Sequence, residues 1–86
     1  MSYQLSLKGT AQKEFIDLSA QVRARIAAKL DALEQDPRPA GAEPLAGPLK
    51  GLLRIRVGEY RVVYHVDEKQ RHITVTRVRH RSKAYG

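Results

Sequence analysis

Apolar and polar residues alternate along the chain with two periods, and each period predicts a different kind of element. Residues 3–7 alternate singly, which predicts a short strand. Thr10 is a plausible N-cap for a helix over residues 11–18, and Ser19 is one for a second helix. The second helix carries an apolar stripe at helical spacing, made of Val22, Ile26, Leu30 and Leu33. Pro37 ends it, because proline cannot continue a helix and disfavours helical geometry at the residue before it.

The second half of the chain predicts strands. Residues 52–57 and 60–66 flank Gly58 and Glu59, a Gly-X pair that suits a type II′ hairpin turn. A polar loop follows, and residues 72–78 are then rich in β-branched side chains, which predicts a further strand.

The predicted order is β-α-α-β-β-β, which indicates a single small α+β domain over residues 1–86. Residues 37–48 hold four prolines and two glycines and are expected to be a connecting loop. We expect the later strands to form an antiparallel sheet packed on a helical hairpin. The other face of that sheet would be left for water or a partner.

Strand alternation sorts the hairpin residues onto two faces. The apolar set expected to face the helices is Leu53, Ile55, Val57, Tyr60, Val62, Tyr64 and Val66. The opposite face receives Arg54, Arg56 and Arg61. Three clustered guanidiniums repel one another unless an anion lies among them, and their planar donors suit phosphate oxygens. The alternative is that they are ordinary solvent-facing residues with cross-strand partners.

The last predicted strand has a break in its pattern. Ile73 and Val75 share a face, but Val78 is out of phase with them. A bulge could restore the phase, or both faces could be partly covered. The basic residues that follow are Arg77, Arg79, His80 and Arg81. Periodicity does not decide which of them join the hairpin arginines.

Charge separates the two halves of the chain. The net charge is +7, and residues 50–86 supply all of it, with ten Lys and Arg against three Asp and Glu. Such confinement favours an anionic partner over a merely solvated basic surface. The absence of cysteine excludes disulfides and zinc-thiolate sites. No apolar run is long enough for a signal peptide or a membrane span, so we expect a cytoplasmic protein without a membrane partner.

The run PLKGLLRIRVGEYRVVYHV, followed by VTRVRHRSKAY, resembles the RelE/ParE toxin superfamily of type II toxin–antitoxin systems, on its RelE side. The resemblance covers nearly the whole chain. It implies a RelE-like toxin that enters the 70S ribosome, cuts mRNA in the A site and is neutralised by a cognate RelB-like antitoxin. Operator DNA would be bound only by the toxin–antitoxin complex. The alternatives are a ParE-like toxin that inhibits DNA gyrase without cutting RNA, and a degenerate partner that only binds its antitoxin.

The resemblance also implies an active site. Its members would be Arg54 and Arg56 on the first hairpin strand, Arg61 on the second, and Arg81 and Tyr85 near the C-terminus. Such residues could support metal-independent cleavage, in which the substrate's own 2′-OH attacks the adjacent phosphorus. Nothing in the sequence resembles a carboxylate metal site, so we expect neither a metal nor a cofactor.

Well-known RelE-type members carry lysines where this chain has Arg54 and Arg56. Arginine does not release its proton, so a general base at either position is not expected. His80 is the candidate replacement, because some relatives use a histidine near the C-terminus, although it could equally be a packing or surface imidazole. RNA contacts are expected from Lys50, Arg54, Arg56, Arg79 and Lys83. We expect His65 and His72 to be structural or exposed.

Overall fold

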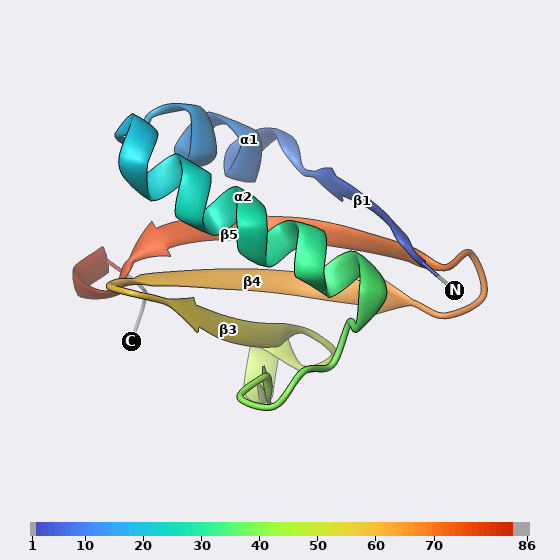
Figure 1. The fold of residues 1–86 in the computed structure, drawn as a ribbon. Helices are drawn as coiled ribbons and strands as arrows, with labels where there is room; N and C mark the ends of the chain where they lie inside the picture. Colours follow the sequence, from blue (N-terminus) through green and yellow to red (C-terminus); the bar gives the residue numbers. More distant parts are fainter. Residues whose placement is uncertain (1, 84–86) are drawn as a thin grey trace.

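The structure, a computed structural model, describes residues 2–83 and places two helices on one face of a five-stranded sheet (Figure 1). The elements in chain order are β1 (Gln4–Leu7), α1 (Gly9–Ile16), α2 (Ala20–Gln35), β2 (Glu43–Pro44), the 3₁₀ turn η1 (Gly47–Leu49), β3 (Leu53–Val57), β4 (Tyr60–Asp67), β5 (His72–His80) and the 3₁₀ turn η2 (Arg81–Lys83). The predicted α+β fold is confirmed.

The sheet is mixed rather than antiparallel throughout. Its strand order is β1-β5-β4-β3-β2, and β3, β4 and β5 form the predicted antiparallel meander. β1 runs parallel to β5, with Leu5 beside Ile73, and the intervening chain carries the crossover that a parallel pair requires. The segment predicted to be only a loop contributes β2, which pairs with β3.

The helix ends agree with the sequence in part. α1 begins at Gly9, and its N-cap position is Lys8, whose side chain makes no capping hydrogen bond. The predicted Thr10 cap is therefore wrong, because Thr10 already lies inside the first turn. Ser19 does cap α2: its hydroxyl oxygen accepts from the backbone N–H of Val22 at 3.3 Å.

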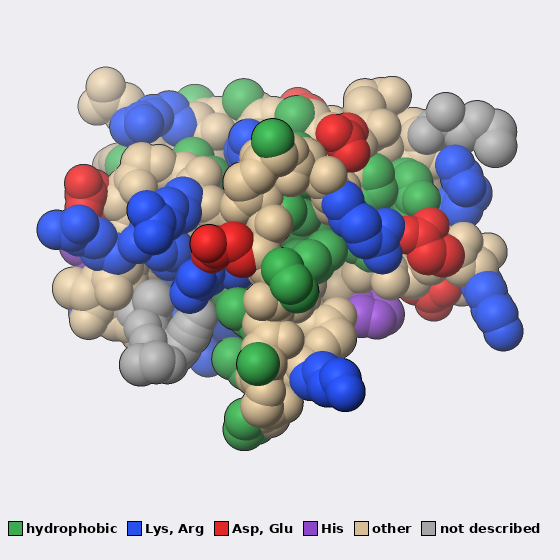
Figure 2. Space-filling view, turned by 90° about the horizontal axis from the view of Figure 1, so that it is seen from below, with side chains coloured by type: hydrophobic (Ala, Val, Ile, Leu, Met, Phe, Trp, Pro, Cys, Tyr) green, Lys and Arg blue, Asp and Glu red, His purple; other side chains and the backbone are tan. Residues whose placement is uncertain are grey.

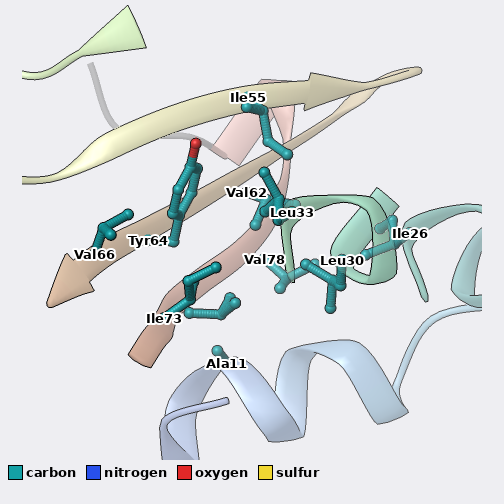
Figure 3. Close-up of a cluster of buried hydrophobic side chains, with 11 residues drawn as sticks. Ala11, Ile26, Leu30, Leu33, Ile55, Val62, Tyr64, Val66, Ile73 and Val78 are labelled. Carbon is teal, nitrogen blue, oxygen red and sulfur yellow. The ribbon is translucent and has the colours of Figure 1, made fainter. Parts of the chain in front are cut away.

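The core lies between the helices and the sheet (Figure 3). Its buried members are Ala11, Ile26, Leu30, Leu33, Ile55, Val62, Tyr64, Val66, Ile73, Val75 and Val78. The predicted inward side of the hairpin is thus confirmed, with Leu53, Val57 and Tyr60 packed against this core. Tyr64 is fully buried, and its hydroxyl donates to the carbonyl of Pro37 at 2.7 Å. Desolvation raises the pKa of Tyr64 to about 12.

The turn between β3 and β4 contains Gly58, whose φ is 61°. No non-glycine residue of this turn has a positive φ, as expected for type II′. A Cβ at Gly58 would lie 3.0 Å from the guanidinium of Arg25, so both conformation and space favour glycine.

A β-bulge resolves the phase break in β5. Tyr64 pairs with Val75 and Val63 pairs with Arg77, which leaves Thr76 as the extra residue. Beyond the bulge, Val78 is buried in the core cluster. Of the two explanations for the sequence pattern, the bulge is therefore confirmed.

We call the side of the sheet away from the helices the open face. The sequence predicts that this face is left for water or a partner. In Figure 1 the β2–η1 segment lies on this side, so the chain itself covers part of the face. Val63 points to the open face and is nevertheless only 6% exposed. Leu49 and Leu52 line the same hollow as Val63, so the segment around η1 partly covers β4.

Candidate functional site

The register of β3, β4 and β5 lines up three arginines across the open face. Arg56 pairs with Arg61, and Arg61 pairs with Arg79. Residues paired in this way carry their side chains on the same face, with Cβ atoms about 4.5–5.5 Å apart. We call these three residues the arginine row. The neighbouring set across the same strands is Arg54, Val63 and Arg77.

The open face concentrates positive charge toward one end of the sheet. Figure 2 shows Lys and Arg side chains toward both ends of this face, most closely gathered toward the end where β3 turns into β4, with acidic side chains beside them. A hollow of about 180 Å³ opens next to the arginine row, lined by Leu49, Leu52, Arg61, Val63, Thr76, Arg77 and Arg79. One wall is apolar, and the other is cationic.

Three carboxylates border the arginine row. Glu43 on β2 is 2.6 Å from Arg54, Glu14 on α1 is 2.8 Å from Arg77 and 3.7 Å from Arg79, and Glu59 in the turn is 2.9 Å from Arg81. Within residues 2–83, no carboxylate oxygen lies within 4.0 Å of Arg56 or Arg61. Arg56 and Arg61 therefore lack the internal counter-ions that the neighbouring arginines have.

Glu43 belongs to the site although the sequence did not indicate it. Its hydrogen bond with Arg54 lowers the pKa of Glu43, and the charges of Arg54, Arg56 and Arg61 lower it further. This carboxylate is therefore ionised at neutral pH. It stands in a proline-rich segment without periodicity, and only the pairing of Glu43 with Arg54 brings it to the arginines.

Glu14 reaches the site around the edge of the sheet. β1 ends at Leu7, beside Val75, and leaves the rest of the β5 edge without a neighbouring strand. Glu14 Oε1 accepts the Val78 N–H on this edge at 2.8 Å, and Oε2 accepts from Arg77 Nη2 at 2.8 Å. Desolvation raises the pKa of Glu14, but these two sets of hydrogen bonds outweigh it and lower the pKa overall. The sequence carried no signal for this contact.

His80 does not join the arginine row. It pairs with Tyr60, whose side chain packs against the core, so His80 takes the opposite face from Arg79. The two rings meet edge to face with centroids 5.3 Å apart. His80 Nδ1 lies 2.9 Å from the hydroxyl oxygen of Ser82. This placement matches a packing imidazole and separates His80 from Arg56 and Arg61.

The C-terminal arginine that enters the row is Arg79. Arg81 follows the strand in η2 and is held at the turn by Glu59. Lys50, directly after η1, and Lys83, in η2, are exposed. Tyr85, the remaining candidate, lies outside the described residues.

The other two histidines lie apart from the arginine row. His65 is exposed on β4, and His72 Nε2 lies 2.8 Å from the Ser6 hydroxyl oxygen, beside β1. The described part of the chain contains no group of three or more His, Cys, Asp or Glu that could hold a metal ion. Nor does it contain a helix long and apolar enough to span a bilayer.

Comparison with known proteins places this chain in a family. A family model described as the ParE toxin of the type II toxin–antitoxin system parDE matches residues 5–85. The chain belongs to this toxin family. It is 28% identical to toxin RelG of Mycobacterium tuberculosis over 86 residues, which is 99% of this chain and 98% of the relative. The RelE/ParE superfamily indicated by the sequence is thus confirmed.

Solved structures agree with this placement of the toxin. The RelBE2 toxin–antitoxin complex from Mycobacterium tuberculosis aligns with a TM-score of 0.84 and 25% identity, over 93% of this chain and 99% of that one. The archaeal RelE–RelB complex from Pyrococcus horikoshii OT3 aligns with a TM-score of 0.78 and 28% identity, over 98% of this chain and 100% of that one. The toxin therefore has the RelE-like fold.

Proposed function

We propose that this toxin is an mRNA endonuclease that cuts in the ribosomal A site without a metal ion. The observation that carries the proposal is the arginine row, in which neither Arg56 nor Arg61 has a described carboxylate within 4.0 Å. Cations without an internal counter-ion attract the phosphates of a polyanion. Their planar donors suit a phosphate, because a guanidinium can bind two oxygens at once.

The row supports charge stabilisation during phosphoryl transfer. In the proposed reaction, the 2′-OH gives its proton to a base and attacks the adjacent phosphorus, the P–O5′ bond breaks, and the leaving O5′ takes a proton from the protonated base or from water, so that the products are a cyclic phosphate and a free 5′-OH. Negative charge grows on the non-bridging oxygens as the 2′-OH attacks. Arg61 stands between Arg56 and Arg79 and is placed to stabilise that charge, while its neighbours hold the adjacent phosphates.

A proton acceptor is needed at the 2′-OH, and arginine cannot serve. Glu43 is the carboxylate that the charges of Arg54, Arg56 and Arg61 reach. It is ionised at neutral pH and has a free lone pair to accept a proton, as a weak base because the arginines lower its pKa. We therefore assign the base to Glu43 rather than to His80, which lies on the opposite face of β5.

The hollow beside the row suits a nucleotide base. Leu49, Leu52 and Val63 supply an apolar wall, and Arg61 and Arg79 supply the cationic rim. Single-stranded RNA is commonly bound with its bases splayed onto such surfaces and its phosphates on nearby cations. This arrangement would orient the nucleotide next to the bond that is cut.

Partners follow from the relatives. The RelBE2 and RelE–RelB structures are toxin–antitoxin complexes, so we propose a RelB-like antitoxin that neutralises this toxin. Operator DNA would be bound by the toxin–antitoxin complex rather than by the toxin alone. The 70S ribosome with its mRNA would be the cellular target, which places the toxin in the cytoplasm.

A second candidate is inhibition of DNA gyrase without RNA cleavage. The observation that favours it is the family model itself, which describes a ParE toxin. The same fold can host both activities, so the site has to decide between them.

Two assays separate the candidates. Purified toxin is added to a translating extract and mRNA 5′ ends are mapped by primer extension; the same preparation is tested for inhibition of gyrase supercoiling. We expect cuts in phase with codons that disappear in Arg61→Ala. Arg71→Ala is the matched control, because Arg71 lies over the Tyr3 ring at the opposite end of the sheet. Intact mRNA together with inhibited supercoiling would reverse the assignment.

A further inference from the structure

Glu14 is held more firmly than the other carboxylates that pair with arginines. Its side chain is 21% exposed, against 51%, 54% and 62% for Glu68, Glu43 and Glu59. Exposed ion pairs are weak, because water and salt screen them and both side chains move. A less exposed carboxylate that also accepts a backbone N–H has fewer other positions and partners to move to. The contact between Glu14 and Arg77 is therefore the most persistent of these ion pairs.

The contact neutralises Arg77 more completely than Arg79. Arg77 donates to Glu14 Oε2 through Nε at 3.2 Å and through Nη2 at 2.8 Å. Arg79 approaches the same oxygen through Nε at 3.7 Å, beyond hydrogen-bond length. Both guanidiniums line the hollow beside the arginine row, but Arg77 commits its Nε and Nη2 donors and its charge to Glu14, whereas Arg79 makes no hydrogen bond with this carboxylate.

We propose that Glu14 is a specificity-determining residue that withholds Arg77 from RNA and so confines phosphate contacts on the open face to the arginine row. The inference rests on RNA being the ligand of this face, as in the proposed function. A face with few available cations binds free RNA weakly, and the toxin then depends on its target to present the strand. Glu14 thus limits binding to RNA outside that target.

Salt dependence measures this effect. The logarithm of the RNA affinity falls with the logarithm of salt concentration, with a slope of about −0.7 for each phosphate contacted on a single strand. A guanidinium that already holds a carboxylate releases no counter-ion from RNA. Freeing Arg77 should therefore make the slope steeper by about 0.7, the value for one additional phosphate contact.

The experiment compares Glu14→Gln with the wild-type toxin for binding a fluorescent single-stranded RNA over a series of salt concentrations. The glutamine retains an oxygen that can accept the Val78 N–H, and thermal unfolding checks the fold. Glu68→Gln is the matched control: it makes the same change in net charge at a glutamate paired with Arg38, at the other end of the sheet. We expect a steeper slope for Glu14→Gln alone. Equal slopes for the two variants overturn the proposal.

A measurement on the wild-type toxin needs no substitution. Arginine Nε–H resonances are followed by NMR during titration with the same RNA. We expect the signals of Arg56 and Arg61 to shift and that of Arg77 to stay in place. A shift of Arg77 as large as that of Arg61 contradicts the proposal, even if Glu14→Gln does not fold.

Neither test depends on cleavage, so the two proposals fail separately. If no mRNA is cut but Glu14→Gln gains the steeper slope, the nuclease proposal fails and the role of Glu14 stands. If mRNA is cut but the slope does not change, only the role of Glu14 fails.

Discussion

The two ends of the sheet both carry arginines beside carboxylates, but they use these charges in opposite ways. At the end where β4 turns into β5, Glu68 binds Arg38 and accepts the Tyr3 hydroxyl at 2.6 Å, while Arg71 lies 4.8 Å from the centroid of the Tyr3 ring. This closed cluster ties together the N-terminal segment, the chain after α2 and the β4–β5 turn.

At the other end, carboxylates pair with the arginines beside the row but not with Arg56 or Arg61. Arg54 and Arg77 hold carboxylates, whereas Arg56 and Arg61 have none within 4.0 Å among the described residues. A count of arginines would not distinguish the two ends. The informative feature is a cation left without a partner beside a hollow, because folding alone does not account for it.

The largest expected effect is on cleavage by Arg61→Ala. Removing a donor that stabilises transition-state charge costs about 10²–10³ in rate. We expect a loss of that size in ribosome-dependent cleavage, measured by 5′-end mapping in single-turnover reactions, with an unchanged melting temperature. Arg71→Ala should retain wild-type cleavage. Equal losses in both variants would remove the contrast between the two ends.

Glu43→Gln should reduce cleavage about 100-fold, at the low end of general-base contributions, because a carboxylate with a lowered pKa is a weak base. As the pH is lowered, the wild-type rate should therefore stay constant and should fall only below the ordinary carboxyl pKa of 4.5. An imidazole base would instead lower the rate below about pH 6.5. A pH–rate profile of single-turnover cleavage, with His80→Gln alongside, decides between them.

Tyr64→Phe tests a buried core residue that belongs to neither end of the sheet and for which no binding partner is expected. Loss of the hydroxyl leaves the Pro37 carbonyl without this donor and should lower the free energy of unfolding by about 1–2 kcal/mol. The folded state raises the pKa of Tyr64 to about 12, so its stabilising contribution is present below about pH 10 and is lost as pH rises from 10 to 12. Urea denaturation at several pH values should show this alkaline loss in the wild type and not in Tyr64→Phe.

The smallest effect is expected from Glu68→Gln in the closed cluster. Hydrogen bonds from Tyr3 and Arg38 lower the pKa of Glu68, so any stabilisation is present at neutral pH and is lost as pH falls below about 4.5. These side chains are exposed, and exposed ion pairs contribute little. Cleavage and the melting temperature at neutral pH should match the wild type. A clear loss of cleavage would show that this end also serves the target.

Local periodicity accounts for what the sequence predicted well. The apolar stripe of α2, the type II′ turn and the outward direction of Arg54, Arg56 and Arg61 depend on neighbours within one helix or hairpin, and the structure confirms them. The arginine cluster was therefore foreseeable from alternation alone.

What the sequence could not provide depends on contacts between distant segments. The pairing of β1 with β5 and of β2 with β3 is decided by which sheet edges are available, and these edges bring Glu14 and Glu43 to the arginines. The selection of Arg79 over Arg81 depends on the register between β4 and β5. None of these leaves a local pattern.

At Thr76, β5 holds one residue more than the strand it pairs with, so neither a substitution nor a loss at this position changes which side chains face the core. A substitution at position 76 leaves the count of residues unchanged, so Val78 still points inward and Arg77 and Arg79 still point outward. A deletion of Thr76 would remove only the extra residue and leave Val75, Arg77, Val78 and Arg79 in regular alternation, so the two arginines would keep their face and the valine would stay in the core. The bulge therefore marks a position where β5 can lose a residue without exchanging core for binding surface.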